Sequence, residues 1–315
     1  MRGSRSDFGF VPWYIYSWRV GLHSLFHGKC NREVLLRFLE PIAFYRCIEV
    51  PWVERALRPW TQKGMRVLDV GSPKFIGLYL AQDFGTNVWC TDILDSALED
   101  YRRFSAALPR ARHLLSFETH DARSMSYRND TFDAIYSVSV LEHIPGEGDH
   151  LAIREMERVL KPGGVLAITV PYRTGYAEGF VRRSVYERQY EGGEPVHWSR
   201  YYDLAALRDR LVSQLEASHL EMATLFQHRP ASYVAFYSTP KPLRALRFLT
   251  NPIHAKLGFR RLCEGKDTLL KLWDHLPKAA SSLLYGERIE EIERKAQPFG
   301  VACLAFRKVR GKGAE

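Results

Sequence analysis

Short apolar runs alternate with amphipathic stretches between residues 65 and 170. The apolar runs have the length and the branched or aromatic content of buried strands, and they cover residues 67–70, 87–92, 114–119, 131–138 and 165–170. The stretches between them place apolar residues at helical spacing, and they cover residues 75–82, 96–108 and 150–160. Strands that alternate with helices in this way predict a doubly wound α/β fold, with a mostly parallel sheet covered on both faces.

The first strand leads into a glycine turn that has the pattern of a cofactor cradle. Val67-Leu68-Asp69-Val70-Gly71 is a strand with an acidic residue near its end, followed by a turn and a helix start. Asp92 closes the second strand 21 positions after Gly71, and a carboxylate at this spacing can accept both hydroxyls of a ribose. Asp121 follows the third strand, where it suits an adenine amine, with the Ala122 backbone beside the ring. The alternative is that Asp92 caps the next helix and that Asp121 belongs to an ordinary turn.

Five motifs of the chain resemble class I S-adenosylmethionine-dependent methyltransferases, most closely the small-molecule and quinone-type branch. They are Val67-Leu68-Asp69-Val70-Gly71, Thr91-Asp92, His120-Asp121-Ala122, the segment from Phe132-Asp133 to Leu141-Glu142-His143-Ile144, and Leu160-Lys161-Pro162-Gly163-Gly164. The resemblance covers residues 60–175 and, more loosely, the strand expected at 301–307. It implies a Rossmann-like, doubly wound, seven-stranded and mostly parallel sheet with one antiparallel edge strand. It also implies S-adenosyl-L-methionine as the cofactor, lying across the carboxyl ends of the strands.

The resemblance assigns eight residues to the cofactor and one to catalysis. Asp69 and Gly71 belong to the methionine part, Asp92 to the ribose, Asp121 and Ala122 to the adenine and Ser137 to the methionine side, with Ser72 and Ile93 completing the set. His143 follows the fourth strand, near where the methyl group should project, and is the candidate general base. The same Leu-Glu-His-Ile motif is frequent in the family whatever the substrate, so the assignment of His143 is the weakest of these.

The glycine turn departs from the family pattern. The family usually has further glycines two and four positions after the first, whereas this chain has Pro73 and Phe75. Pro73 has no N–H to offer a cofactor, and we expect Lys74 to take over part of the polar contact. Pro73 and the acidic Asp69 argue more strongly against a pyrophosphate, and hence against an NAD-dependent dehydrogenase. The alternative to S-adenosylmethionine binding is a decayed site.

The chain has a net charge of +9, but its central part is acidic and the segments on either side of it are basic. Residues 1–66 hold eleven Lys and Arg against five Asp and Glu, residues 67–240 hold eighteen against twenty-three, and residues 241–288 hold ten against four, giving +6, −5 and +6. We expect an N-terminal helical cap at 1–60, an S-adenosylmethionine-binding domain at 61–240 and 298–310, and a basic helical insert at 241–297. In the cap, Arg46 and Glu49 either reach the site or lie on a solvated surface.

The insert and one further segment bear on the partners of the protein. Arginines at 244, 247, 260 and 261 interleave with leucines, as in a basic amphipathic helix at an anionic membrane surface. The alternatives are a helical lid packed on the core or a homodimer surface. Residues 171–202 combine tyrosines with arginines, which suits a planar or acidic acceptor. No RNA-binding module accompanies these residues, so no nucleic-acid partner is expected.

The remaining composition excludes several classes of protein. The five cysteines are scattered without a Cys-x-x-Cys pair or a Cys/His cluster, which predicts a reducing compartment and no metal site. No uncharged apolar stretch reaches about eighteen residues, so no spanning helix is expected. We therefore expect a cytoplasmic enzyme, with peripheral membrane contact left open. Its expected reaction is methyl transfer from S-adenosylmethionine to a small-molecule or lipid-linked acceptor. The alternative is a non-catalytic scaffold bound to a membrane or protein partner through its basic helices.

Overall fold

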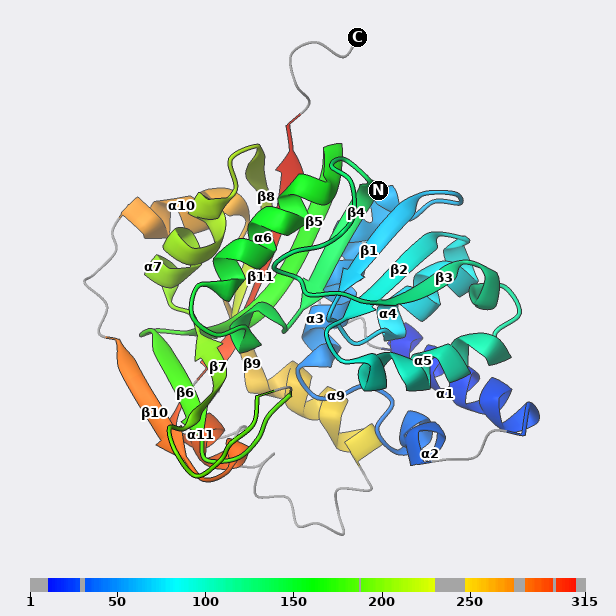
Figure 1. The fold of residues 1–315 in the computed structure, drawn as a ribbon, viewed down its shortest axis with the longest axis horizontal. Coiled ribbons are helices and arrows are strands. Elements are labelled where there is room, and N and C mark those ends of the chain that lie inside the picture. The colour runs from blue at the N-terminus through cyan, green and yellow to red at the C-terminus, as the bar shows by residue number, and fades with distance from the viewer. Residues whose placement is uncertain are drawn as a thin grey trace.

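The computed structural model describes residues 11–28, 32–186, 188–229, 247–274, 281–296 and 299–309. A large twisted sheet crosses the molecule, with helices on both of its faces and a smaller sheet beside it (Figure 1). In order across the large sheet, the strands are β3 (Leu115–Thr119), β2 (Asn87–Asp92), β1 (Arg66–Val70), β4 (Phe132–Val138), β5 (Leu160–Arg173), β11 (Phe299–Lys308), β8 (Ser218–His228) and β9 (Phe259–Glu264). The doubly wound α/β fold expected from the alternating pattern is confirmed.

The far side of the sheet differs from the expectation in two respects. Strands β3, β2, β1, β4 and β5 are parallel, but β11 runs antiparallel to both of its neighbours, β5 and β8. The antiparallel strand therefore lies inside the sheet, not at its edge. Beyond the seven expected strands, β9 pairs antiparallel with β8 and becomes the eighth. The strand expected at 301–307 corresponds to the central part of β11.

Successive residues of the central strands point to opposite faces, so each face has its own core. On one face Val67 of β1 joins a cluster with helices α3 (Arg46–Leu57), α4 (Phe75–Tyr79), α5 (Asp95–Ala107) and α9 (Arg247–Gly258). On the other face Leu68 joins helices α6 (Gly148–Val159), α7 (Leu204–Ala206) and α10 (Lys266–Asp274). This double coverage explains why the strands read as continuous apolar runs and do not alternate with polar residues.

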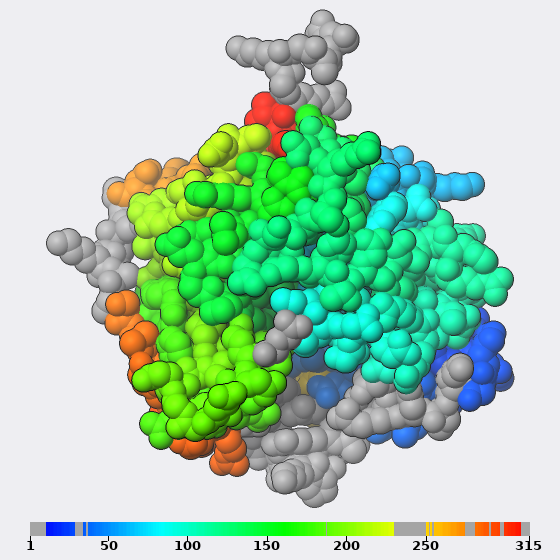
Figure 2. All heavy atoms as spheres, in the orientation of Figure 1, coloured from blue at the N-terminus to red at the C-terminus, as the bar shows by residue number. Residues whose placement is uncertain are grey.

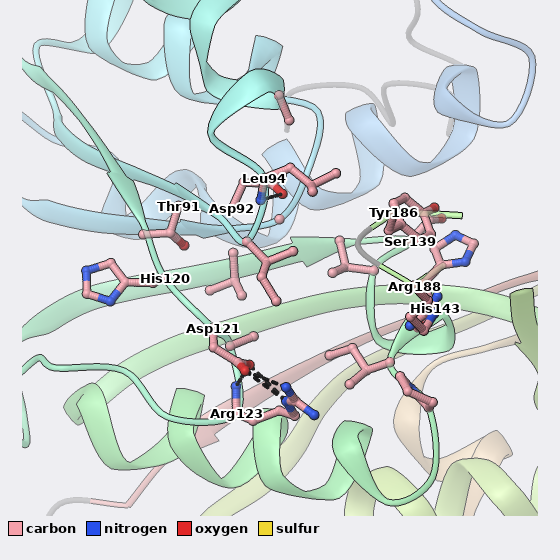
Figure 3. Close-up of a pocket in the computed structure, with 18 residues that line it drawn as sticks. Thr91, Asp92, Leu94, His120, Asp121, Arg123, Ser139, His143, Tyr186 and Arg188 are labelled. Carbon is pink, nitrogen blue, oxygen red and sulfur yellow. Dashed lines mark hydrogen bonds and ion pairs between the residues drawn. The ribbon is translucent and has the colours of Figure 1, made fainter. Parts of the chain in front are cut away.

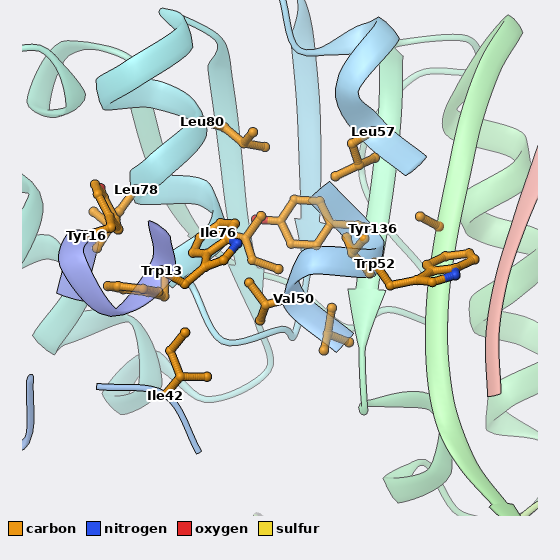
Figure 4. Packing of buried hydrophobic residues seen from close by; sticks show 14 of the residues in the cluster. Trp13, Tyr16, Ile42, Val50, Trp52, Leu57, Ile76, Leu78, Leu80 and Tyr136 are labelled. Atoms are coloured by element: carbon orange, nitrogen blue, oxygen red, sulfur yellow. The ribbon is translucent and has the colours of Figure 1, made fainter. Parts of the chain in front are cut away.

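The N-terminal cap packs aromatic rings onto the first helix after the glycine turn. It consists of α1 (Val11–Phe26) and α2 (Arg32–Leu39), followed by α3. Trp13 and Tyr16 of α1 belong to the buried cluster drawn in Figure 4. They pack against Phe75 and Tyr79, with the ring centroids of Trp13 and Tyr79 4.5 Å apart. Phe75, which departs from the glycine of the family pattern, is thus a packing residue that anchors the cap.

The expected basic helical insert is only partly helical. Besides α9 and α10, it contains β9, β10 (Ser282–Gly286) and the short helix α11 (Ile289–Lys295). Strand β10 pairs with β6 (Ala177–Val181), which pairs with β7 (Val196–Tyr201), to form the smaller sheet. The sequence analysis did not predict these strands, because the pairing of β10 depends on a partner about a hundred residues away in the chain, and the residue spacing within the insert carries no information about that partner.

A buried arginine holds the smaller sheet against the main domain. Arg200 of β7 is fully buried, and its guanidinium forms an ion pair with Asp149 of α6 at 3.2 Å. It also donates to the carbonyl oxygen of Gly146 at 2.7 Å. Arg210 and Tyr202 bind the same carboxylate at 2.7 and 2.9 Å. Because every charge in this cluster has a partner, the smaller sheet has a defined position beside the carboxyl ends of the strands.

Candidate functional site

A cavity of about 330 Å³ opens at the carboxyl ends of β1, β2, β3 and β4 (Figure 3). In Figure 2 the surface is hollowed between the cyan residues that follow β2 and the green residues of the smaller sheet. Six of the nine predicted site residues line this cavity, namely Gly71, Asp92, Ile93, Asp121, Ala122 and His143. A second hollow of about 340 Å³ shares Gly71, Asp92 and His143 with the first and adds Ser72 and Lys74. Segments distant in the chain thus converge at one site.

The two acidic residues of the cavity are held differently. Asp92 at the end of β2 accepts a hydrogen bond from the backbone N–H of Leu94 at 3.1 Å and keeps part of its carboxylate open to the cavity. Asp121 is bound by Nε and Nη2 of Arg123, with the shortest contact at 2.6 Å. This pairing lowers the pKa of Asp121. A ligand at Asp121 therefore competes with Arg123, whereas a ligand at Asp92 meets a freer carboxylate.

Asp69 and Ser137 lie beneath the cavity and do not line it. Asp69 is fully buried, and its carboxylate accepts hydrogen bonds from Tyr136 Oη at 2.6 Å and from the Ser72 backbone N–H at 3.1 Å. The Ser137 hydroxyl donates to the carbonyl oxygen of Val70 at 3.1 Å. Both residues hold the strand ends in place, so in this geometry they support the site from below.

Lys74 is the residue around which the unusual turn is built. Its side chain is buried, and its Nζ lies 3.0 Å from Asp69 Oδ1 and 2.7 Å from the carbonyl oxygen of Thr91. Asp92 Oδ2 lies 3.7 Å away. Burial raises the pKa of Asp69, and the charge of Lys74 opposes that rise. Lys74 therefore supplies within the chain the positive charge that Asp69 was expected to find in the cofactor.

The first glycine of the turn is required by geometry. Gly71 has φ +65°, and a Cβ built on it would lie 2.7 Å from Val140 Cγ1. Its N–H donates to the carbonyl oxygen of Thr91, which ties the turn to β2. Ser72 then accepts a hydrogen bond through Oγ from the Val138 N–H at 2.7 Å. The turn keeps its shape through these bonds without the second and third glycines.

His143 stands at the end of the cavity between aromatic rings. Its Nδ1 lies 2.6 Å from the carbonyl oxygen of Trp198, which assigns the ring proton to Nδ1 and leaves the Nε2 lone pair free to accept a proton. The rings of Trp198 and Tyr186 lie 4.7 and 5.2 Å from the imidazole, by their centroids. Burial lowers the pKa of His143 to about 4, so the imidazole is neutral near pH 7. A neutral imidazole with a free nitrogen is the form that a general base requires.

A carboxylate from the cap reaches the same end of the site. Glu49 of α3 is buried, pairs with Arg46, and accepts hydrogen bonds from the hydroxyls of Ser139 at 2.5 Å and Thr169 at 2.8 Å. Ser139 lines both hollows and has φ +51°, a strained backbone for serine. Of the two alternatives for Glu49, a solvated surface position is wrong. Ser139 had no sequence signal, because its role depends on contact with a helix ninety residues away.

Glu142 is a second buried carboxyl group beside the first. Burial raises its pKa to about 8, and the neighbouring charge of Glu49 acts in the same direction. Its Oε2 has no hydrogen-bond partner among the described residues, and its Oε1 lies 3.8 Å from His143 Nε2. Glu142 is therefore largely protonated near pH 7.

In the described part of the chain no group of three or more His, Cys, Asp or Glu side chains is arranged to hold a metal.

Comparison with known proteins identifies the domain that carries this site. A family model described as a methyltransferase domain matches residues 68–168. Residues 68–168 are therefore similar to a methyltransferase domain. Methyltransferase GfsG from Streptomyces halstedii is 34% identical over 108 residues, which are 33% of this chain and 37% of that protein. Sterol 24-C-methyltransferase erg6 from Aspergillus fumigatus is 30% identical over 159 residues, or 49% and 38% of the two chains. The chain thus spans little more than a third of the length of these curated relatives.

A solved structure extends the likeness of the fold beyond the methyltransferase domain. The crystal structure of the [4+2]-cyclase SpnF covers 95% of this chain and 96% of its own, with a TM-score of 0.50 and 18% sequence identity. At this identity the likeness concerns the fold alone. It extends to the helical cap and the smaller sheet, although the described function of that protein is a cyclisation.

Lys74→Met should lower the free energy of unfolding by about 3–5 kcal/mol, because it leaves Asp69 as an unpaired buried charge. Denaturant unfolding measures the change, and the exposed Lys63→Met is the matched control, expected within about 0.5 kcal/mol of wild type. The double variant Asp69→Asn/Lys74→Met should lose less of its free energy of unfolding than Lys74→Met alone, because it leaves no unpaired buried charge. A Lys74→Met protein as stable as wild type would mean that Asp69 is already neutral in the fold.

The imidazole of His143 should stay neutral between about pH 5.5 and 8, with its proton on Nδ1. Nitrogen NMR of the histidine rings measures this, and the His143→Gln variant identifies the resonance. Because the folded pKa of about 4 lies below the ordinary 6.5, the unfolded chain binds more protons between these values. The contribution of His143 to stability is therefore present above about pH 6.5 and is lost as the pH falls toward 4. A titration midpoint of the His143 ring near pH 6.5 in the folded protein would show that burial does not lower its pKa.

Proposed function

We propose that this chain transfers a methyl group from S-adenosylmethionine to a small-molecule or lipid-linked acceptor. The observation that carries the proposal is the position of Asp92, beside the Gly71 turn and in the same cavity as Asp121 and His143. A carboxylate at the end of β2 suits the two ribose hydroxyls, and the apolar walls formed by Leu94 and others suit a purine ring. The cofactor fits the residues that are present, although the turn is unusual.

The residues divide the work of binding in the following way. Asp92 would accept hydrogen bonds from the ribose, and Ala122 would lie beside the adenine. Asp121 would reach the adenine amine only in competition with Arg123. Arg46, which lines the second hollow beside Ser72, would face the carboxylate of the methionine part. Asp69 and Ser137 would act from below by fixing the strand ends.

When bound, the cofactor supplies a methyl group already activated by a sulfonium centre. The protein then has to align the acceptor, exclude water and remove a proton. His143 Nε2 is free to take that proton, because Nδ1–H is bound to the carbonyl oxygen of Trp198. The stacked rings of Tyr186 and Trp198 lie beside the imidazole at this end of the cavity.

The lipid-linked part of the proposal rests on two observations. One curated relative of the chain is named as a sterol methyltransferase. The cavity is walled mainly by apolar side chains, which suits an acceptor with a hydrophobic body. The competing proposal is a non-catalytic scaffold, and it is favoured by the internal pairing of Asp69 with Lys74 and of Asp121 with Arg123. Cofactor binding distinguishes the two proposals.

Titration calorimetry should show S-adenosylmethionine binding with a constant in the micromolar range, on the order of −8 kcal/mol. Asp92→Ala should weaken the binding by about tenfold to a hundredfold, because a charge-assisted hydrogen bond contributes roughly 1.5–3 kcal/mol. Asp121→Ala should weaken the binding of S-adenosylmethionine less, because the Asp121 carboxylate is already bound by Arg123. No heat with S-adenosylmethionine or its demethylated product would favour the scaffold. If Asp92→Ala and Asp121→Ala are both folded and lose equally little affinity for S-adenosylmethionine, the ribose does not bind at Asp92.

Transfer itself should depend on His143 more than binding does. With methyl-labelled S-adenosylmethionine and a total lipid extract plus a panel of hydroquinones, the wild-type chain should label an extractable product. His143→Gln should retain cofactor affinity within about threefold and lose about 10²–10⁴-fold in rate, as expected for removal of a general base. His120→Gln, which lies at the other end of the same cavity, is the matched control. Equal rates of methyl transfer in wild type and His143→Gln would mean that His143 is not the general base.

A further inference from the structure

Helix α1 is apolar on two opposite faces. Its inner face packs Trp13, Tyr16 and Val20 into the core of the cap. Its outer face exposes six large apolar side chains, Val11, Ile15, Trp18, Leu22, Leu25 and Phe26. Ile15 is 57% exposed and Phe26 86% exposed. A helix that is hydrophobic all round normally buries its whole circumference, so the outer face of α1 lacks a partner among the described residues.

The six exposed side chains form one continuous stripe. Five of them, Val11, Ile15, Trp18, Leu22 and Phe26, follow one another at steps of four, three, four and four residues. At 100° per residue all six fall within an arc of about 100°, along a helix of about 24 Å. Helix α2 lies alongside, as the hydrogen bond from Ser17 Oγ to the Arg37 carbonyl oxygen shows, and it adds further exposed leucines at 35 and 39. Scattered surface leucines need no explanation, but a contiguous stripe does.

The sequence that contains α1 carries a net positive charge, which points to an anionic lipid surface as the partner of the stripe. Residues 1–32 contain five Lys and Arg against one Asp, which gives +4. An apolar helix face accompanied by basic residues is attracted to anionic lipid, and each nearby cation strengthens the attraction. The same charge disfavours a second copy of this chain, whose net charge is also +9. Among the described helices none is long and apolar enough to cross a membrane, so α1 would lie on the surface.

We infer that α1 docks this protein onto an anionic membrane, with its outer stripe inserted at the level of the lipid headgroups. A hollow of about 240 Å³ between α2 and α3 supports this orientation. It is lined by Arg37, Ile42 and Phe75, and it shares Arg46 and Tyr101 with the hollow beside the glycine turn. An apolar acceptor leaving the membrane at α2 would therefore reach the site by a short path. This path rests on the proposed methyl transfer, whereas the docking itself does not.

The insert was the other candidate for membrane contact, and two of its four predicted arginines are engaged elsewhere; the side chain of Arg247 is not among those that the structure describes. Arg260 lies on β9 and donates to Gln227 Oε1, and Arg261 pairs with Glu264. Arg244 lies outside the described residues. Helix α9 of the insert exposes Ile253 and Leu257, which are as exposed as the residues of the α1 stripe. These two residues provide a matched control for the stripe.

Vesicle co-sedimentation of the full chain tests the inference. Neutral phosphatidylcholine vesicles are compared with vesicles that contain roughly one third phosphatidylserine, at about 50 and about 500 mM salt. Wild type should bind the anionic vesicles at low salt and bind them more weakly at high salt. Ile15→Ser/Leu22→Ser/Phe26→Ser should weaken binding at least tenfold, whereas Ile253→Ser/Leu257→Ser should change it less than threefold. Thermal unfolding confirms that both variants are folded.

Several outcomes would overturn the inference. Wild type that ignores anionic vesicles at low salt would leave the stripe without a lipid partner. Equal binding by the stripe variant and wild type would remove α1 from the contact, and loss only in the α9 variant would assign the contact to the insert. A wild-type dimer that the stripe variant converts to a monomer in sedimentation velocity, without vesicle binding, would make a second copy the occupant. None of these measurements requires cofactor or turnover, so failure of methyl transfer leaves the result unaffected.

Discussion

The buried ion pair between Lys74 and Asp69 holds the floor of the site together. Lys74 comes from the turn after β1, Asp69 from β1 itself, and Thr91, whose carbonyl oxygen Lys74 also binds, from β2. Tyr136 of β4 adds a hydrogen bond to the same carboxylate. Three neighbouring strand ends are thus joined through two charges that no solvent reaches. The positions of Gly71 and Asp92, and with them the shape of the cavity, depend on this pair.

This pair also explains how the chain does without the usual glycines. A glycine-rich turn lets the backbone approach a ligand closely, and its own polar groups then meet the ligand. Here Pro73 and Phe75 rule out that solution, and Phe75 serves instead to anchor α1. The turn is kept in shape by side chains, namely Ser72 toward β4 and Lys74 toward β1 and β2. Rigidity comes from a desolvated charge pair, which is costly to break and therefore fixes one geometry.

The parallel half of the sheet could be predicted from the sequence, because each strand and helix there follows its neighbour in the chain. Gly71, Asp92 and Asp121 were found for the same reason, since parallel strands end at one edge. The burial of Asp69 could not be foreseen, because it depends on Lys74 folding back over it. Strand β9, strand β10 of the smaller sheet and the Glu49–Ser139 contact depend on partners 31 to 105 residues away, and local spacing carries no sign of them.

Strand β11 lies between β5 and β8, although it is the last strand of the sheet to be synthesised. From the end of β5 at Arg173 to the start of β11 at Phe299, 125 residues intervene. At about 5–20 residues per second a ribosome needs roughly 6–25 s to make them. During that interval the inner edge of β5, which reads Val165-Leu166-Ala167-Ile168-Thr169-Val170, has no neighbour to pair with. An apolar strand with an open edge is a template for aggregation, so the nascent chain carries this exposed edge until β11 closes the gap.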